Sequence, residues 1–394
     1  MIRTATILGF VLIITFLAGY GYLWSREKFT LLRPTLFVPQ PRILSNETKR
    51  TNEIIGFLPY WNLKSVSYIP YDKLTTIYYF AIDIDGEGNF NQDDAGLHKL
   101  KSEEFKTLRS YATNFPTLRL GTTIVSLNAD DIAQVVNSPA RQKKLINNTV
   151  SLMKREGFQD LNFDFEYLGD FDKSTQRNYT LLVRKLTETV HKEIPGSRIS
   201  FDTFADAVVK TRIFDIPEIA KIVDRVIIMG YDFHRTSSIK AGPIAPLFGK
   251  EKYEYEIYQS VVDYLRHVPN EKLILAVPFY GYEWPTQDPN PNSYVVGSVR
   301  GPEIASYKRS LETAEKNNTS VNFDDHSKSA WFSYFDKESN TFRQVWFENE
   351  RSLGLKFDLI NQAGLAGAAI WALGYDGENN NLLWKTVKEK LLPL

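Results

Sequence analysis

The chain has 394 residues, of which 43% are hydrophobic and 13% aromatic, and this is enough apolar material for one large domain or two ordinary domains. Its 47 Lys and Arg residues balance its 47 Asp and Glu residues, so net charge gives no reason to expect a nucleic acid or another acidic polymer as partner. The chain lacks cysteine, which excludes disulfides and thiol nucleophiles, and its 5 histidines are scattered without metal-ligand spacing, so we expect no metal and no cofactor.

An apolar segment near the start runs from Ala5 to Trp24 without a charged residue. A membrane-spanning helix needs about 20 such residues, so we predict a membrane anchor over residues 1–28. A secretory signal that is cleaved off is the alternative, although only "AGYG" approaches the small-residue pattern of a cleavage site. Residues 29–52 contain prolines followed by polar residues and follow no helical or strand period, which predicts a linker.

Short apolar runs of β character alternate with segments of helical period over residues 53–394. The runs start near residues 53, 74, 117, 159, 197, 224, 272 and 365, and two of the helical segments span residues 141–157 and 174–193. Strands that alternate with helices in this way predict an α/β fold, the (β/α)8 TIM barrel. A doubly wound open sheet is the alternative, but no Gly-rich phosphate loop follows the first run.

The connection between the seventh and eighth runs is about 80 residues long, far longer than one barrel connection requires. Within it, "SAWFSYFDKESNTFRQVWFEN" alternates on both sides of a polar turn, which predicts a β-hairpin, and "ERSLGLKFDLINQAG" predicts a helix that ends at Gly364. We therefore expect a small α+β insertion over about residues 285–350. It would stand beside the C-terminal mouth of the barrel and form one wall of a groove.

The fourth run, "FQDLNFDFEYL" at residues 158–168, alternates polar and bulky apolar residues. In a strand, successive side chains point to opposite faces, so Asn162, Asp164 and Glu166 share one face. A solvent-facing polar side of a sheet is the ordinary explanation for such a pattern. Helices cover the outside of a barrel, however, so these side chains should point inward, and the active sites of barrels lie at the C-terminal ends of the strands.

Other candidate residues lie where the later strands end. Tyr231 and Asp232 follow the sixth run, and Tyr282 and Trp284 follow the seventh. Trp371 lies near the end of the eighth run. Taken singly, an aromatic residue at such a place would ordinarily pack in the core, but the joint location of these residues at strand ends favours a site.

These residues give the chain a resemblance to glycoside hydrolase family 18, the chitinase-like enzymes. The family pattern in strand four is DGxDxDxE, and its last three marked positions fall on Asn162, Asp164 and Glu166. The strand-six motif is matched by "MGYD" at residues 229–232, and the strand-eight tryptophan by Trp371. Two further segments, "VPFYGYEW" and "RQVWFENERSL", resemble the subgroup of spore cortex-lytic N-acetylglucosaminidases and similar bacterial wall hydrolases. The resemblance covers residues 53–394.

The chain departs from the family pattern in strand four. Gln159 and Asp160 stand in place of the Asp-Gly pair, and Asn162 stands where the first inner Asp is expected, although the subgroup often carries Asn there. Asn162 can offer hydrogen bonds but cannot titrate, so the sharing of a proton along this strand is weakened.

The resemblance implies a TIM-barrel glycosidase that uses the acetamide of its own substrate as the nucleophile. Glu166 would be the general acid, and Asp164 would stabilise the positive charge of the oxazolinium intermediate. Tyr231 would hold the acetamide carbonyl, and Trp371 would be the floor on which the reacting sugar stacks. Glu283 is expected at the rim of the groove. The further substrate-binding candidates are Asn162, Asp232, Tyr282, Trp284 and Tyr60.

The combined expectation is a membrane-tethered, monomeric glycosidase, anchored by a single span with its catalytic domain outside the cytoplasm. Its substrate would be a β-1,4-linked glycan that contains N-acetylglucosamine, of peptidoglycan or chitin type, cleaved with retention and without a metal. A sugar-binding protein on the same barrel that has lost its activity is the alternative. The presence of Glu166 and Asp164 favours catalysis, because a lectin has no need of a proton donor.

Overall fold

The computed structural model describes residues 52–378 and 382–392 of the chain. The predicted membrane anchor, and the predicted linker as far as residue 51, lie outside the described residues. None of the helices in the described part of the chain combines the length and the apolar character that crossing a membrane requires.

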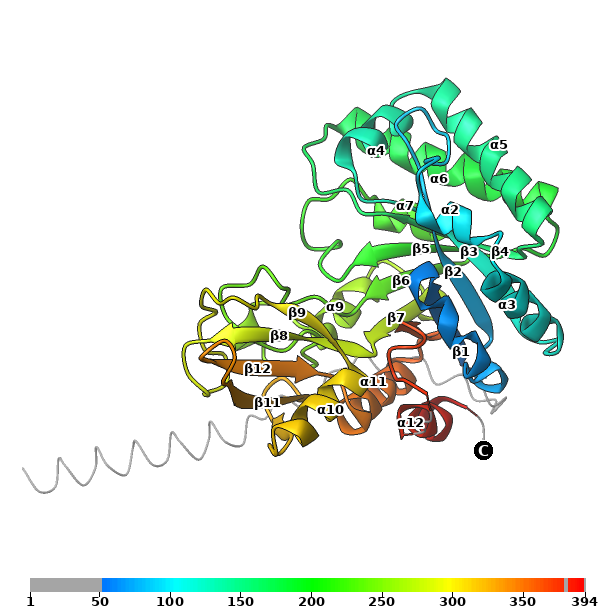
Figure 1. Cartoon of the computed structure of the whole chain (residues 1–394). Coiled ribbons are helices and arrows are strands. Elements are labelled where there is room, and N and C mark those ends of the chain that lie inside the picture. The colour runs from blue at the N-terminus through cyan, green and yellow to red at the C-terminus, as the bar shows by residue number, and fades with distance from the viewer. Residues whose placement is uncertain (1–51, 379–381, 393–394) are drawn as a thin grey trace, which may run out of the picture. The chain divides into compact units, whose positions relative to one another are not determined.

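Parallel strands close into a barrel of eight in the described ranges, in the order β1-β13-β7-β6-β5-β4-β3-β2. Each predicted run contains one of these strands, so the predicted TIM barrel is confirmed (Figure 1). The barrel strands are β1 (Glu53–Pro59), β2 (Thr76–Asp83), β3 (Arg119–Ser126), β4 (Asp160–Phe165), β5 (Ile199–Phe204), β6 (Arg225–Met229), β7 (Leu273–Pro278) and β13 (Gly367–Trp371).

The helices begin and end at the residues that favour helix ends. At the start of α5 (Pro139–Glu156), the side chain of Ser138 accepts a hydrogen bond from the backbone N–H of Arg141, and at its end Gly157 adopts a left-handed conformation with φ 75°. The helix α11 (Glu350–Ala363) ends in the same way at Gly364, as predicted. The other predicted helix is α6 (Lys173–Glu193). The remaining helices are α2 (Ala95–Lys99), α3 (Glu103–Thr113), α4 (Ala129–Val136), α7 (Ile216–Ile222), α8 (Lys250–Tyr253), α9 (Ile257–Tyr264), α10 (Tyr307–Lys316) and α12 (Leu382–Leu391), with the 3-10 helices η1 (Tyr60–Ser67), η2 (Tyr71–Lys73) and η3 (Asn270–Lys272).

A second sheet lies between β7 and β13 in the sequence, with 5 strands in the order β10-β11-β12-β8-β9. Its strands β11 and β12 form the predicted antiparallel hairpin. The sheet begins at Tyr280, ahead of the predicted start near residue 285, because only Phe279 separates β8 from β7 and no turn marks the boundary. Figure 1 shows this sheet to one side of the barrel and the long helices α5 and α6 to the other. Its strands are β8 (Tyr280–Thr286), β9 (Glu303–Ser306), β10 (Asn322–Asp324), β11 (Ser329–Asp336) and β12 (Thr341–Phe347).

The alternation along β4 decides which of its side chains reach the barrel interior. Phe163 and Phe165 are buried in the apolar layer between the barrel strands and the helices. There, Phe163 packs edge-on against Tyr179 of α6, with ring centroids 6.1 Å apart. Asn162 and Asp164 therefore point to the opposite side, into the barrel. A separate apolar cluster shares that interior and consists of Ile55, Phe57, Tyr78, Ile227, Ile274, Ala276, Ala366 and Ala369.

Candidate active site

The polar face of β4 leads from the barrel interior to its mouth. Asn162 is fully buried and Asp164 is 3% exposed. Glu166 directly follows the last strand residue, Phe165, and is partly exposed. Its backbone N–H still donates to the carbonyl of Ser126 on β3 at 3.0 Å, which fixes the end of the strand. The predicted residues thus run in order from a buried amide to a carboxyl group that solvent can reach.

A cavity of about 180 Å³ lies at the C-terminal ends of the barrel strands. Its walls combine carboxyl groups with aromatic rings, among them Trp61, Phe80 and Tyr280. Such a cavity can bind a molecule that has one flat apolar face and several polar groups. It brings together six of the residues predicted from the sequence, which are Asp164, Glu166, Tyr231, Asp232, Tyr282 and Trp371.

Aromatic neighbours hold the indole of Trp371 in place at the end of β13. Its ring stacks against Tyr231, with centroids 6.4 Å apart and 20° between the planes, and it meets the edge of Phe80 at 4.5 Å. Phe57 of the interior cluster supports it at 5.9 Å. A flat apolar surface that is fixed in this way can carry the apolar face of a sugar ring.

The loop after β6 carries Tyr231 and Asp232, and side chains of β8 fix the second of these. Asp232 has a left-handed backbone conformation with φ 61°, which Asp adopts more readily than most residues. Its carboxylate accepts hydrogen bonds from the hydroxyl groups of Tyr280 and, at 3.1 Å, of Tyr282. Burial, together with the nearby charge of Asp202, raises the pKa of Tyr231. The Tyr231 phenol therefore stays neutral and can donate a hydrogen bond.

The carboxyl groups of Asp164 and Glu166 are both biased towards their protonated forms. Burial raises the pKa of Glu166, the nearby charge of Arg235 lowers it, and Asp232 raises it again, with a net upward shift. A general acid requires such a shift, because it acts in its protonated form. Burial and the charges of Asp202 and Glu166 also raise the pKa of Asp164 well above its usual value. In the ranges that the structure covers, no group of three or more His, Cys, Asp or Glu side chains could hold a metal ion.

Comparison with known proteins places this geometry in a family. The family model described as glycosyl hydrolases family 18 matches residues 53–376. The chain belongs to glycosyl hydrolase family 18. The cortical fragment-lytic enzyme of Bacillus subtilis (strain 168) is 27% identical over 262 residues, which cover 65% of this chain and 56% of that enzyme. The di-N-acetylchitobiase of Homo sapiens is 26% identical over 289 residues, which cover 68% of this chain and 73% of that enzyme.

A solved structure supports the fold of this family 18 chain independently. The Group IV chitinase of Ostrinia furnacalis superposes with a TM-score of 0.76 at 22% sequence identity, over 86% of this chain and 99% of that chain. The family match and the curated relatives together identify the chain as a glycosidase.

Three other predicted site residues do not line the family 18 cavity. Asn162 lies below it in the barrel interior. Trp284 is fully buried, and its indole N–H donates to the backbone carbonyl of Arg235 at 3.0 Å, so it fixes the loop that carries this arginine. Tyr60 lines a neighbouring cavity of about 580 Å³, which Trp61 also lines.

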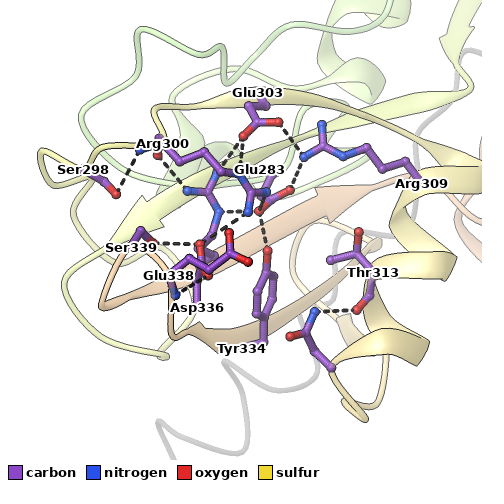
Figure 2. Close-up of polar contacts among 12 residues, drawn as sticks. Glu283, Ser298, Arg300, Glu303, Arg309, Thr313, Tyr334, Asp336, Glu338 and Ser339 are labelled. Carbon is purple, nitrogen blue, oxygen red and sulfur yellow. Dashed lines mark hydrogen bonds and ion pairs between the residues drawn. The ribbon is translucent and has the colours of Figure 1, made fainter.

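The expectation that Glu283 lies at the rim of the groove is wrong. Its side chain is fully buried in the second sheet. Figure 2 shows its carboxylate between Arg300 and Arg309, which donate at 2.8 Å and 2.6 Å, and Tyr334, which donates at 2.6 Å. The fully buried Arg343 donates to it as well. These donors explain why Glu283 is buried, because a carboxylate can be removed from water where cations surround it. The network fixes the face of β8 opposite to the one that carries the cavity tyrosines.

Three residues around Glu166 were not selected from the sequence. Asp202 alternates with Ser200 in "SRISFDTFA", which is the same pattern that identified strand four, so a signal for it was present. Tyr280 alternates with Tyr282 in the same way at the start of β8. Arg235 lies in a loop, and no local pattern distinguishes it from other surface arginines.

Proposed function

We propose that this chain hydrolyses β-1,4-linked glycans that contain N-acetylglucosamine, with peptidoglycan as the preferred substrate, by a retaining, substrate-assisted mechanism. The observation that carries the proposal is the shared cavity, which Asp164, Glu166 and Tyr231 line together with Trp371. The cortical fragment-lytic and chitobiase relatives support a substrate of this class.

Each of these residues has one role in the first step. Trp371 carries the reacting sugar, and Tyr231 donates a hydrogen bond to the acetamide carbonyl, whose oxygen attacks the anomeric carbon. Glu166 gives its proton to the glycosidic oxygen as the C–O bond breaks, so the leaving sugar departs as an alcohol. Asp164 accepts a hydrogen bond from the acetamide N–H and stabilises the positive charge of the oxazolinium ring.

Water completes the reaction from the side that the leaving sugar has vacated. Glu166, now a carboxylate, takes a proton from the water as its oxygen attacks the anomeric carbon and the acetamide is released. Two displacements at the same carbon give net retention of configuration.

A second cavity, of about 360 Å³, is lined by Glu166 and Tyr231 but not by Trp371. The acid has to reach the glycosidic oxygen, which joins the reacting sugar to the leaving sugar, so this cavity on the other side of Glu166 is where the leaving sugar would bind. The cavity contains both acidic and basic side chains, and its basic residues are Lys210, Arg212 and Arg235.

Arg235 is better placed than its basic neighbours to bind an acidic leaving sugar. Arg212 and Lys210 are paired with Asp206 at 2.8 Å and 2.9 Å. The ion pair of Arg235 with Asp232 is longer, at 3.8 Å, and the Arg235 side chain is 49% exposed. The lactyl group of muramic acid is a free carboxylate in glycan that lacks stem peptides, whereas chitin is uncharged. A contact between this carboxylate and the guanidinium would therefore favour peptidoglycan.

Replacing Arg235 by glutamine tests the function and the preference together. We expect kcat/KM on peptide-free fragments that contain muramic acid to fall about tenfold relative to kcat/KM on chitooligosaccharides, because one charge-assisted hydrogen bond contributes about 1.5–3 kcal/mol. Reducing ends are measured with the full chain in detergent, at the optimum pH of each variant, since loss of Arg235 also raises the pKa of Glu166.

Lys210→Gln is the matched control for this experiment, and it should leave the ratio of the two substrates within about twofold, because this lysine is exposed and already paired. An unchanged ratio in Arg235→Gln would contradict the role of Arg235 in the preference for peptidoglycan. Failure of the wild type to cleave either substrate would contradict the proposed function itself.

We also propose that residues 1–28 tether the enzyme to the cell membrane with the catalytic part outside the cytoplasm. The uncharged segment Ala5–Trp24 supports a single span, and a tether would hold the hydrolase at the envelope, where wall glycan is found. We expect expression in a bacterium to give a membrane-sedimenting protein whose intact mass is that of the full chain. A shorter protein in the medium would instead indicate a cleaved secretory signal.

A further inference from the structure

The active site contains a second buried carboxyl group on the strand next to Asp164. The register of β4 and β5 pairs Asn162 with Ser200. Two residues further along, this register places Asp164 beside Asp202, and both side chains face the barrel interior. Both residues line the cavity that contains Glu166, and they are 3% and 6% exposed.

Asn162 links the two strands directly below these carboxyl groups. Its amide nitrogen donates to Ser200 Oγ at 2.9 Å and to Asp202 Oδ1 at 2.8 Å. Its own oxygen, and Oδ1 of Asp164, are buried and have no hydrogen-bond donor among the described residues. Both atoms are hydrogen-bond acceptors. A carboxyl group of this cluster that keeps its proton would have an O–H group, which could donate a hydrogen bond to such an acceptor.

The charges around the pair also favour a retained proton. In the described part of the chain, no cation contributes to the pKa shift of either Asp164 or Asp202. Two carboxylates that share a buried site without a cation cannot both be ionised, since each disfavours the charge of the other. The pKa of Asp202 is raised to about 8, because burial and the charge of Glu166 raise it by more than the hydrogen bond from Asn162 lowers it. The other titratable groups near Asp202 carry no positive charge and are Tyr78 of β2, Tyr179 of α6 and Tyr231 after β6.

We propose that Asp202 supplies the titratable carboxyl group that strand four lacks at Asn162, and that Asp202 shares one proton with Asp164 during catalysis. The inference rests on the proposed function of the site. When Asp164 accepts the acetamide N–H, the shared proton stays on Asp202, so the pair keeps a single negative charge and no proton leaves the cavity. Asp202 acts through Asp164 and is therefore a positioning residue.

Replacing Asp202 by asparagine keeps the shape of the side chain and removes its proton. The full chain, labelled with 13C at the aspartate carboxyl groups and kept in detergent, is titrated by NMR, and the Asp164 signal is identified as the one missing from Asp164→Asn. All spectra are recorded in the Glu166→Gln background, because the charge of Glu166 also acts on Asp164. In this background, a shared proton makes Asp164 titrate in two steps when Asp202 is present and in one step in Asp202→Asn. A packing role for Asp202 would leave the titration of Asp164 unchanged, and that result would overturn the proposal.

A double variant returns the carboxyl group to β4 by combining Asn162→Asp with Asp202→Asn. We expect kcat to fall about tenfold in Asp202→Asn, which corresponds to a displacement of one pKa unit at Asp164. In the double variant, kcat should recover to within about threefold of the wild type, and the titration in two steps should return. A loss of kcat that the double variant does not restore, with the pH profile of kcat/KM unmoved, would also count against the proposal.

The two measurements keep this inference separate from the proposed function. If Asp164 titrates in two steps only when Asp202 is present, but the wild type cleaves no N-acetylated glycan, the shared proton is supported and the proposed function fails. If the wild type cleaves glycan but Asp164 titrates in one step in the Glu166→Gln background, the function stands and the shared proton is disproved.

Discussion

Replacing Glu166 by glutamine is expected to reduce glycan cleavage by about 10³-fold or more while sugar binding is retained. Glutamine has the same shape and can still hydrogen-bond to the glycosidic oxygen, but it has no acidic proton to give to the leaving sugar. General acid–base catalysis by one group typically contributes about 10²–10⁴-fold. Cleavage is measured as the release of reducing ends from chitooligosaccharides and peptidoglycan fragments, and binding of the same sugars by calorimetry.

The pH dependence provides a second readout of the same variant. Burial raises the pKa of Glu166 by more than the nearby Arg235 lowers it. Because the acid acts in its protonated form, kcat/KM has its highest value below this raised pKa and falls as the pH rises through it. The residual activity of Glu166→Gln should lack that alkaline decrease, since the variant has no proton to lose at this position.

Glu188→Gln, on the exposed side of α6, is the control for this experiment and should keep more than about half of the wild-type activity. If the wild type and Glu166→Gln both bind sugar and neither cleaves it, the chain is a sugar-binding protein on the same barrel. Equal cleavage by the two would mean that another group donates the proton.

The barrel could be predicted because its signals are local in the sequence. A strand period of two is visible within a few residues, and helix-ending residues such as Gly157 and Gly364 mark boundaries at single positions. The candidate site benefited from the same topology. A barrel brings all the C-terminal ends of its strands to one mouth, so Glu166, Tyr231 and Trp371 could be grouped although they are far apart in the chain.

Contacts between strands could not be predicted in the same way. The position of Asp202 beside Asp164 depends on the register of β4 and β5, which leaves no local trace in the sequence. The burial of Glu283 could not be predicted either, because its partners come from several segments of the chain. It alternates with groove residues along β8, but the arginines that surround it, such as Arg300 and Arg343, belong to other segments. Only the folded second sheet reveals that the far face of β8 is charged and buried.

Replacing Glu283 by glutamine is expected to lower the free energy of unfolding by about 3–5 kcal/mol, which is the typical cost of removing one partner from a buried ion pair. Arg343 is fully buried, and its remaining carboxylate neighbour, Glu303, lies 3.6 Å away. Its charge would therefore be poorly compensated in a region that water does not reach. The free energy is measured by chemical denaturation of the full chain in detergent, for both proteins at the same pH.

The size of this effect follows from the balance of charges in the network. Three cations face three carboxylates, so neutralising Glu283 leaves an excess positive charge beside Arg343 at the buried centre of the network. Glu283 is the most connected of the carboxylates, because all three arginines and Tyr334 donate to it. The members that carry charge are Arg300, Arg309, Arg343, Glu283, Glu303 and Asp336.

Glu103→Gln is the matched control, because it removes the same charge from an exposed pair. Glu103 and Lys106 lie 2.6 Å apart, but their side chains are 83% and 61% exposed, so water replaces most of the lost interaction. Because Glu103 also lies in the first turn of α3, the free energy of unfolding should fall by at most about 1 kcal/mol. If the loss in Glu283→Gln were no larger, the sheet would be stabilised by its apolar side chains, such as Phe332 and Trp346, without need of the charged network. A large loss confined to Glu283→Gln would instead show that the wall of the groove depends on a single buried carboxylate.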